Sequence, residues 1–497
     1  MEATENLKTI LADIILASSI HGIPGIIRTR KICFKFIWAI SFVISASICA
    51  YMLIKSISDY FDFELVTTTT VKTEMPTVFP KITICNNNPL MTNEAIEYVD
   101  KMFNEWNIKN KDFYELYENP ANKTIYTSMN LYISKMTILS HAHNSTDEFR
   151  KSLGLSIGDM LISCFFALVP CSPNDFEWYF DPFNGNCFKF KMNNNEFSKV
   201  TKEGMLNGLR LELFVGQVLS IKNLAFGNGL VIFINNQTVT PSPFDGYEIE
   251  TGKQTNLHLE KLRIKKVYKP YGECTRNLNE ENAFNSEILK KTLDNYKYYQ
   301  QKDCLNICLQ EYIIQKLNCF STLIRYNSSN IQPCIKTNDI VTVFLLIKDF
   351  FVKIPSECIE GCPLECDSEK YTFMVSSLDY PTKVYAELIG KETVIMSRYG
   401  NRTPKYEELK ESILKLNINY QELEYTLIEE SQKTTWIDLI SNIGGTLGLF
   451  TGFSFLSVVE FFEIIFEIWR VKGRKIFALK NDNLFISNFH LAPKNLQ

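Results

Sequence analysis

Residues 441–460 read SNIGGTLGLFTGFSFLSVVE and decide the fold. They overlap an uncharged run, 439–459, that is long enough as a helix to cross a hydrocarbon core about 30 Å thick. Four glycines and four hydroxyl residues follow Ser441, where a helix facing only lipid would carry leucine. Non-helical backbone at membrane depth is stable only when it is buried in protein or lines water. We therefore expect Gly452-Phe453-Ser454 to present carbonyl groups and a hydroxyl to a pore.

Carboxylates follow this segment on one helical face. Glu460, Glu463 and Glu467 are spaced i, i+3 and i+7. Such residues at a membrane boundary are either interfacial caps or part of a pore lining. Because they share a helix with the glycine-rich segment, we favour the pore lining. Two spans cannot enclose a pore, so several copies must surround an axis with closed cyclic symmetry.

A first candidate span precedes the cysteine-rich part of the chain. Residues 36–54 carry no charge and lie between Lys35 and Lys55. A cleavable signal peptide would begin earlier and be shorter, and a buried core helix is the other alternative. Basic residues precede this span and follow the second one, which predicts that both termini are cytosolic. The chain is then a multi-pass membrane protein.

The spans divide the chain into five parts, with two transmembrane helices flanking a large disulfide-rich α/β ectodomain. We predict a cytosolic N-terminus (1–35), a first transmembrane helix (36–55), an extracellular cysteine-rich domain (56–435), a second, pore-lining transmembrane helix (436–469) and a cytosolic C-terminus (470–497). N-glycosylation motifs occur only in the extracellular part, which agrees with this orientation. They lie at Asn122, Asn144, Asn236, Asn327 and Asn401.

Twelve of the fourteen cysteines lie between Cys85 and Cys366, where an exported segment can oxidise them in pairs. Cys304 and Cys308 are four residues apart on an expected helix, and the same step recurs from Cys358 to Cys366. If the two segments are antiparallel, nested bridges follow. A zinc site is the alternative, but the run contains no histidine. The predicted pairs are Cys85–Cys187, Cys164–Cys171, Cys274–Cys366, Cys304–Cys362, Cys308–Cys358 and Cys319–Cys334.

Hydrophobic periodicity predicts a mixed α/β extracellular domain. Apolar residues recur with a period near two over 257–267, and 229–234 is a short apolar run, so both are expected strands. Helical patterns cover 93–106, 301–318 and 406–416.

Composition excludes several classes of function. With 52 basic against 56 acidic residues, the chain has no overall positive field for nucleic acid. It contains no nucleophile elbow, phosphate-binding loop or metal-ligand spacing, so we expect neither an enzyme nor a bound cofactor or metal.

Three motifs occur in an order that matches one known family. His21-Gly22 precedes the first span, residues 79–86 read FPKITICN, and residues 444–460 carry the glycine-rich pattern. With these motifs nearly the whole chain resembles the degenerin, epithelial sodium channel and acid-sensing ion channel superfamily (DEG/ENaC/ASIC). Within it, the chain is most similar to the invertebrate neuropeptide-gated sodium channels.

The resemblance implies a homo- or heterotrimeric channel with a hand-like ectodomain of palm, finger, thumb, knuckle and ball. It implies an amiloride-blocked sodium pore at the plasma membrane, with residues 452–454 as a Gly-X-Ser filter at an unwound break. The nested bridges then correspond to the thumb, where this chain has only Cys319 and Cys334 at the tip. Implied partners are related subunits, membrane lipid, permeant Na⁺ and an extracellular neuropeptide.

Single residues also match family positions. His21 and Gly22 resemble a re-entrant motif near the filter. Ser441, with Asn442 beside it, resembles the degenerin position, where a bulky side chain holds such channels open; a helix N-cap is the alternative for Ser441.

Two aromatic residues resemble a pair that couples the palm to the membrane. Tyr271 lies in the sequence PYGEC and matches the family's palm aromatic. Phe63, just after the first span, is its expected opposite. Both could equally be ordinary core aromatics.

Two stretches of sequence bear on the stimulus that opens the channel. Residues 59–65 read DYFDFEL, and no histidine lies between the first span and His141, whereas acid-sensing members carry one there. Histidine, with a pKa near 6.5, is the usual sensor of mild acid. Residues 159–164, followed by Cys171, resemble the finger entry of neuropeptide-gated members, so we favour peptide gating. Proton gating, a constitutively open channel and a two-span receptor without a pore are the alternatives.

Overall fold

The computed structural model describes residues 22–105, 123–191, 199–216, 227–237, 239–278, 286–326, 330–463, 465–466 and 469. The chain forms two compact units. One contains residues 1–66 and 432–497, and the other contains residues 67–431. We call them the membrane unit and the outer unit.

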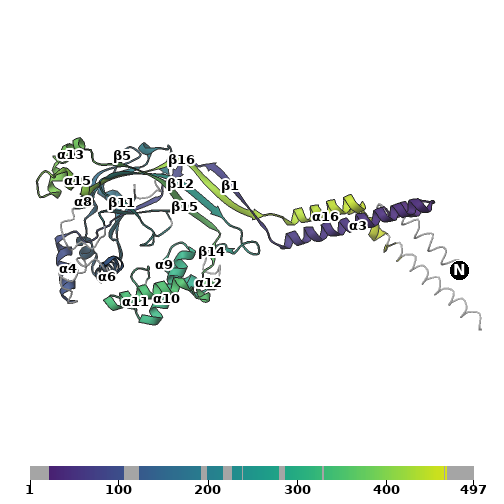
Figure 1. Cartoon of the computed structure of the whole chain (residues 1–497), viewed down its shortest axis with the longest axis horizontal. Coiled ribbons are helices and arrows are strands. Elements are labelled where there is room, and N and C mark those ends of the chain that lie inside the picture. The colour runs from purple at the N-terminus through teal and green to yellow at the C-terminus, as the bar shows by residue number, and fades with distance from the viewer. Residues whose placement is uncertain are drawn as a thin grey trace, which may run out of the picture. The chain divides into compact units, whose positions relative to one another are not determined.

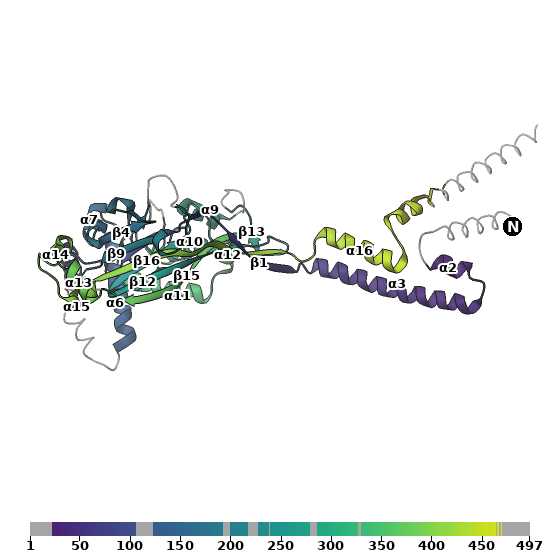
Figure 2. The same cartoon turned by 90° about the horizontal axis from the view of Figure 1, so that it is seen from above.

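The membrane unit is built on two long helical segments, seen side by side in Figure 2. The helix α3 (Ile32–Phe61) is long and apolar enough to span a membrane, and it extends beyond both ends of the predicted span 36–55. The second segment consists of α16 (Trp436–Thr451) and a shorter helix, Phe455–Glu463, bent by 70° at the break between them. The two helices together are long and apolar enough to form a second membrane span with a break in it. The short helix α2 (Ile23–Arg28) packs against α3.

The beginning of α16 is fixed by a capping box. Thr435 Oγ1 accepts a hydrogen bond from the Asp438 N–H at 3.2 Å, and the Asp438 carboxylate accepts one from the Thr435 N–H at 2.9 Å. This reciprocal pair satisfies backbone donors that a helix N-terminus leaves free. The side chains at positions 435 and 438 therefore set where the helix starts.

A seven-stranded sheet forms the centre of the outer unit (Figure 1). Its long strand β16 pairs parallel with β12 and antiparallel with β9, and β1 also pairs with β16. The strands, in spatial order, are β15 (Asp367–Asp379), β12 (Lys253–Lys265), β16 (Ile413–Gln432), β9 (Leu209–Phe214), β4 (Leu161–Phe166) and β5 (Val169–Pro170), with β1 (Leu65–Thr73) beside β16.

A second, five-stranded sheet shares its hydrophobic core with the first. Ile84 and Ile232 from this sheet belong to the same buried cluster as Leu257 and Leu416 from the seven-stranded sheet. This is the largest hydrophobic cluster among the described residues, and its burial stabilises the packing of the two sheets. The strands, in spatial order, are β11 (Tyr247–Glu250), β10 (Gly229–Asn235), β3 (Lys81–Asn86), β7 (Gly185–Phe190) and β6 (Phe176–Asp181).

Short elements complete the outer unit. The two-stranded pairs are β2 (Thr77–Val78) with β8 (Lys199–Val200) and β13 (Cys274–Thr275) with β14 (Leu364–Glu365). The helices are α4 (Asn93–Glu105), α6 (Lys123–His143), α7 (Asp147–Ser152), α8 (Ile157–Met160), α13 (Lys383–Ile389), α14 (Thr393–Arg398) and α15 (Tyr406–Ser412), with 3₁₀ turns Pro173–Asp175 and Met205–Asn207.

One predicted helix is too long. The pattern over 406–416 is helical only to Ser412, because Ile413 begins β16. From there the chain is the central strand between β9 and β12, and Leu414 and Leu416 are buried in the sheet core. Tertiary burial thus overrides the local helical pattern.

Four helices form the thumb-like part of the outer unit, and disulfides join two of them, α10 and α12 (Figure 1). They are α9 (Glu287–Asn295), α10 (Gln301–Leu317), α11 (Thr337–Val352) and α12 (Ser356–Gly361). All six predicted bridges are formed in the structure: Cys85–Cys187, Cys164–Cys171, Cys274–Cys366, Cys304–Cys362, Cys308–Cys358 and Cys319–Cys334.

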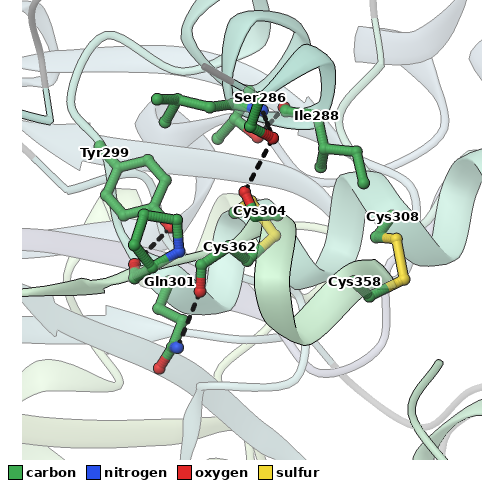
Figure 3. Close-up of a disulfide and its surroundings, with 12 residues drawn as sticks. Ser286, Ile288, Tyr299, Gln301, Cys304, Cys308, Cys358 and Cys362 are labelled. Carbon is green, nitrogen blue, oxygen red and sulfur yellow. Dashed lines mark hydrogen bonds between the residues drawn. A yellow bond between two sulfur atoms is a disulfide. The ribbon is translucent and has the colours of Figure 1, made fainter. Parts of the chain in front are cut away.

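Hydrogen bonds lie around the disulfide between Cys304 and Cys362 (Figure 3). The Gln301 amide donates to the Cys362 carbonyl at 2.9 Å, and the Ser286 hydroxyl donates to the Gly361 carbonyl at 2.9 Å. Both Cys304 and Cys362 are fully buried. The bridge therefore holds the start of α10 and the end of α12 together in a core of their own.

Ion pairs cross the sheet between β12, β15 and the residue after β1. The Lys261 ammonium lies 2.9 Å from Glu74 and 3.4 Å from Glu369, and only 2% of its side chain is exposed. Arg263 contacts the same two carboxylates, each at 2.8 Å. Burial alone would raise the pKa of Glu74, but the hydrogen bonds from Lys261 and Thr77 and the charges of Lys261 and Arg263 together lower that pKa. The four charges therefore stabilise one another where water is largely excluded.

We expect Lys261→Met to destabilise the outer unit by about 3 kcal/mol, because it leaves partly buried carboxylates short of a cation. Thermal melting of the purified full-length protein in detergent measures this. Lys253→Met is a matched control on the same strand, since the Lys253 pair with Asp379 is exposed and should matter little. Equal losses in melting temperature for the two variants would contradict the assignment.

Replacing Cys304 or Cys362 by Ser should cost about 4 kcal/mol, because the bridge closes 58 residues of chain. The double variant should lose no more than either single variant, since all three open the same bond. Surface delivery and melting temperature give the comparison. Cys33→Ser, which removes a free thiol, should change neither. Additive losses in the double variant would show that the two residues do not pair.

Candidate functional site

The break in the second helical segment falls at residues 452–454, where the sequence predicts non-helical backbone. Gly452 has φ 72° and ψ 10°, a left-handed conformation that strains other residues. Its N–H donates to the Gly448 carbonyl at 3.0 Å and so ends α16. The Ser454 N–H then donates to Ser457 Oγ at 3.0 Å, at the start of the next helix.

Because of the break, the C-terminus of α16 lies inside the apolar segment rather than at its end. The last carbonyl groups of α16 lack the helical N–H partners of a continuous helix and carry partial negative charge. Carbonyl oxygens of this kind are suitable ligands for a sodium ion. The geometry at residues 452–454 can thus support cation binding without a charged side chain.

The helix α3 supports the last turns of α16. Ser45 Oγ donates to the Phe450 carbonyl at 2.6 Å, and the Cys49 thiol lies 4.0 Å from the Thr446 carbonyl. Both contacts involve the turns immediately before the break. Polar side chains of α3 therefore satisfy carbonyl groups that face it.

Gly22 of the His-Gly motif and the nearby Gly25 both lie close to side chains of α3. Gly22 has φ 101°, and a Cβ atom there would lie 2.7 Å from the Phe42 ring. A Cβ atom at Gly25 would lie 3.0 Å from Trp38. The small size of these two residues lets α2 pack closely against α3. His21 lies outside the described residues, so its predicted role remains a prediction.

One face of α16 is uncovered within a single chain. Ser441 and Asn442 are exposed there. A Cβ atom added at Gly444 or Gly445 would meet no atom of the described residues within 4 Å. Small residues of this kind allow close approach of another helix.

The predicted carboxylate face is only partly described. Glu460 is half-buried and Glu463 is exposed, both on the helix after the break. Glu467 lies outside the described residues. The three therefore remain a predicted face.

The family model for amiloride-sensitive sodium channels matches residues 15–464. The chain belongs to this family. It is 26% identical over 469 residues to the bile acid-sensitive ion channel of Homo sapiens, covering 91% of this chain and 85% of that one. It is 25% identical over 505 residues to acid-sensing ion channel 1A of Danio rerio, covering 95% and 94%.

A third relative is the epithelial sodium channel subunit beta of Homo sapiens, at 27% identity over 324 residues. That match covers 64% of this chain and 49% of the relative. The superfamily that the motifs indicate is confirmed, and so is the class of fold.

The two aromatic residues compared with the family's coupling pair lie in different units. Tyr271 is half-buried in a tight turn after β12, where a Cβ atom on Gly272 would lie 1.9 Å from the Val267 carbonyl. Phe63 follows α3 with φ 49°, and its ring contacts Phe61 at 6.3 Å between centroids. Their coupling remains a prediction.

The predicted glycosylation sites are partly described. Asn144 and Asn401 are exposed, and Asn236 is half-buried. Asn122 and Asn327 lie outside the described residues. Exposed side chains at Asn144 and Asn401 are accessible for modification.

Two histidines lie at the end of α6. His141 and His143 are in its last turn and are partly buried. Burial lowers the pKa of His141, although Glu105 and the Ile335 backbone raise it. Burial and the Arg150 charge lower the pKa of His143. Both side chains thus bind protons less readily than exposed histidines. Among the described residues, no three His, Cys, Asp or Glu are grouped to hold a metal ion.

Proposed function

We propose that the protein is a sodium-selective, amiloride-blocked cation channel formed by three copies of this chain, or by this chain with related subunits. The observation that carries the proposal is the break at residues 452–454, which interrupts an otherwise apolar segment. A two-span receptor without a pore would need only unbroken transmembrane helices to anchor it, and the break would then have no function. The channel then lies in the plasma membrane with both termini in the cytosol, as the basic flanks favour.

The chemistry of the break suits a cation filter. Glycine at position 452 permits the sharp turn, and the α16 carbonyl groups carry negative partial charge without occupying the pore. Ser454 adds a hydroxyl oxygen, which is a suitable ligand for Na⁺. We further propose that Glu460, followed by Glu463 and Glu467, concentrates cations at the inner mouth.

The uncovered glycines of α16 support assembly. Gly444 and Gly445 present backbone to open space in one chain, and a neighbouring copy can approach there closely. A bulky residue at Ser441 or Asn442 would obstruct this approach, as at the degenerin position. Closed cyclic symmetry would bring equivalent breaks to one axis.

We propose an extracellular neuropeptide as the stimulus. No histidine lies between α3 and His141, and burial lowers the pKa of both finger histidines. The finger entry that resembles peptide-gated members is closed by the Cys164–Cys171 bridge. Relatives named for bile acid and for acid make those stimuli the alternatives to test, together with constitutive opening.

Gly452→Ala and Ser454→Cys should change the Na⁺/K⁺ permeability ratio or abolish current, because they alter the width and ligands of the ring. Reversal potentials in oocytes, with surface biotinylation, measure this. Gly400→Ala, in an open turn of the outer unit with a similar φ of 66°, is the control for backbone strain and should keep selectivity. Wild-type reversal potentials in conducting, surface-delivered filter variants would refute the assignment.

Amidated neuropeptides applied to oocytes should open a current that amiloride blocks, whereas steps from pH 7.4 to pH 5 should not. Co-expression with related subunits covers the case in which the chain works only as a heteromer. A current evoked by acid or bile acid, and not by any peptide, would replace peptide gating and leave the pore assignment intact. An absence of current from every subunit combination at the surface would favour the receptor alternative.

A further inference from the structure

A cavity of about 340 Å³ lies wholly in the outer unit. Strands β6 and β7, the loop before β11, the start of α10 and the loop after α10 contribute to its wall. The side chains that matter to its chemistry are those of His143, Tyr179, Lys189, Tyr296, Asp303 and Arg325. None of these residues belongs to the membrane unit.

The cavity contains a carboxyl group without a hydrogen-bond partner. Asp303 is 3% exposed, and burial and neighbouring charges act on its carboxyl group without a hydrogen bond from the described residues. By contrast Asp181, also in the wall, accepts bonds from the Phe183 and Asn184 N–H groups at 3.0 and 2.7 Å. Asp303 is the third residue of α10, a position at which a carboxylate usually bonds back to the N-cap. An ordinary helix-start role does not account for it.

The cavity wall contains a second buried polar group without a partner in the described part of the chain, the hydroxyl of Tyr179. The Tyr179 hydroxyl is buried and has no hydrogen-bond partner among the described residues. Buried polar groups are nearly always paired, so each exception calls for an explanation. The Lys189 ammonium lies over the Tyr179 ring, 4.5 Å from its centroid. Burial lowers the pKa of Lys189, Glu177 raises it, and the positive charge of Arg325 lowers it further.

We propose that this cavity binds a small aromatic zwitterion, of which a free aromatic amino acid is the simplest example. The ligand's ammonium group pairs with Asp303, and its carboxylate pairs with Lys189 and Arg325. Its ring lies among aromatic side chains such as Tyr296. Cavities of this size hold small ligands, and the ammonium end of the ligand would pair with a buried carboxyl group that lacks a hydrogen bond from the described residues.

The pH dependence of binding follows from the groups around Asp303. Burial raises the pKa of Asp303 to about 7, Lys302 lowers it, and Asp245 and Glu365 raise it further. Pairing with an ammonium group requires the ionised carboxylate. Affinity should therefore rise from pH 6 to pH 8. Burial and the Arg150 charge lower the pKa of His143, so this ring adds less positive charge at the acid end of the range than an exposed histidine would.

The test measures binding of radiolabelled L-phenylalanine to the purified full-length protein in detergent. Phenethylamine, which lacks the carboxylate, and 3-phenylpropionate, which lacks the amine, serve as competitors. We expect saturable L-phenylalanine binding, with each competitor at least tenfold weaker, because each loses one charge-assisted contact.

Variants assign the two ends of the ligand. Asp303→Asn should weaken L-phenylalanine and phenethylamine about tenfold, spare 3-phenylpropionate and abolish the rise with pH. Lys189→Met should show the reverse preference between the two competitors. Asp349→Asn, an exposed carboxylate on α11, is the matched control and should bind as wild type.

Folding is checked separately by thermal melting at pH 8. Because the pKa of Asp303 is raised from 3.8 to about 7, the fold loses stability as the pH rises between these values, and the full loss is present at pH 8. Asp303→Asn should therefore melt no lower than wild type. No saturable binding of L-phenylalanine, or binding that neither Asp303→Asn nor Lys189→Met changes, would overturn the proposal. Because the readout is binding rather than current, its failure would leave the proposed channel function untouched.

Discussion

Backbone carbonyl groups cannot remain unpaired in hydrocarbon, and the membrane unit is arranged around this constraint. The segment that begins with α16 stops being helical at Gly452, so the preceding carbonyl groups lose their regular partners. Ser45 on α3 meets one of them, at Phe450. The others need water, an ion or a neighbouring copy. This local interruption is therefore the feature on which the proposed assembly and the proposed cation site both depend.

Much of this organisation is readable from the sequence because its causes are local. The four-residue spacing of Cys304 and Cys308 recurs from Cys358 to Cys366, and nested bridges follow if the two segments are antiparallel. The glycine at position 452 and the hydroxyl two residues later indicate where α16 ends. The first span is recognisable from its uncharged run, although α3 continues beyond it because α-helical backbone tolerates flanking Lys35 and Lys55 in the same helix.

Other features depend on residues far apart in the sequence and leave no local pattern. Glu74 and Glu369 meet at Lys261 only after three strands assemble, and the requirement for glycine at position 22 comes from the Phe42 ring on α3. The helix expected to reach residue 416 ends at Ser412, because burial at the centre of a sheet outweighs local propensity. The partner-free carboxyl of Asp303 is likewise visible only once the cavity wall has formed.

The cysteines fall into two chemically separate groups, which makes this chain convenient for spectroscopy. Twelve are locked in disulfides of the outer unit, and the remaining two, Cys33 and Cys49, both lie on α3. Cys33 is exposed near the beginning of that helix, whereas Cys49 is buried against α16. A thiol-reactive spin label or fluorophore, used without reductant, therefore attaches selectively at Cys33. Distances between labels on neighbouring copies can then report on assembly and motion without first removing the native cysteines.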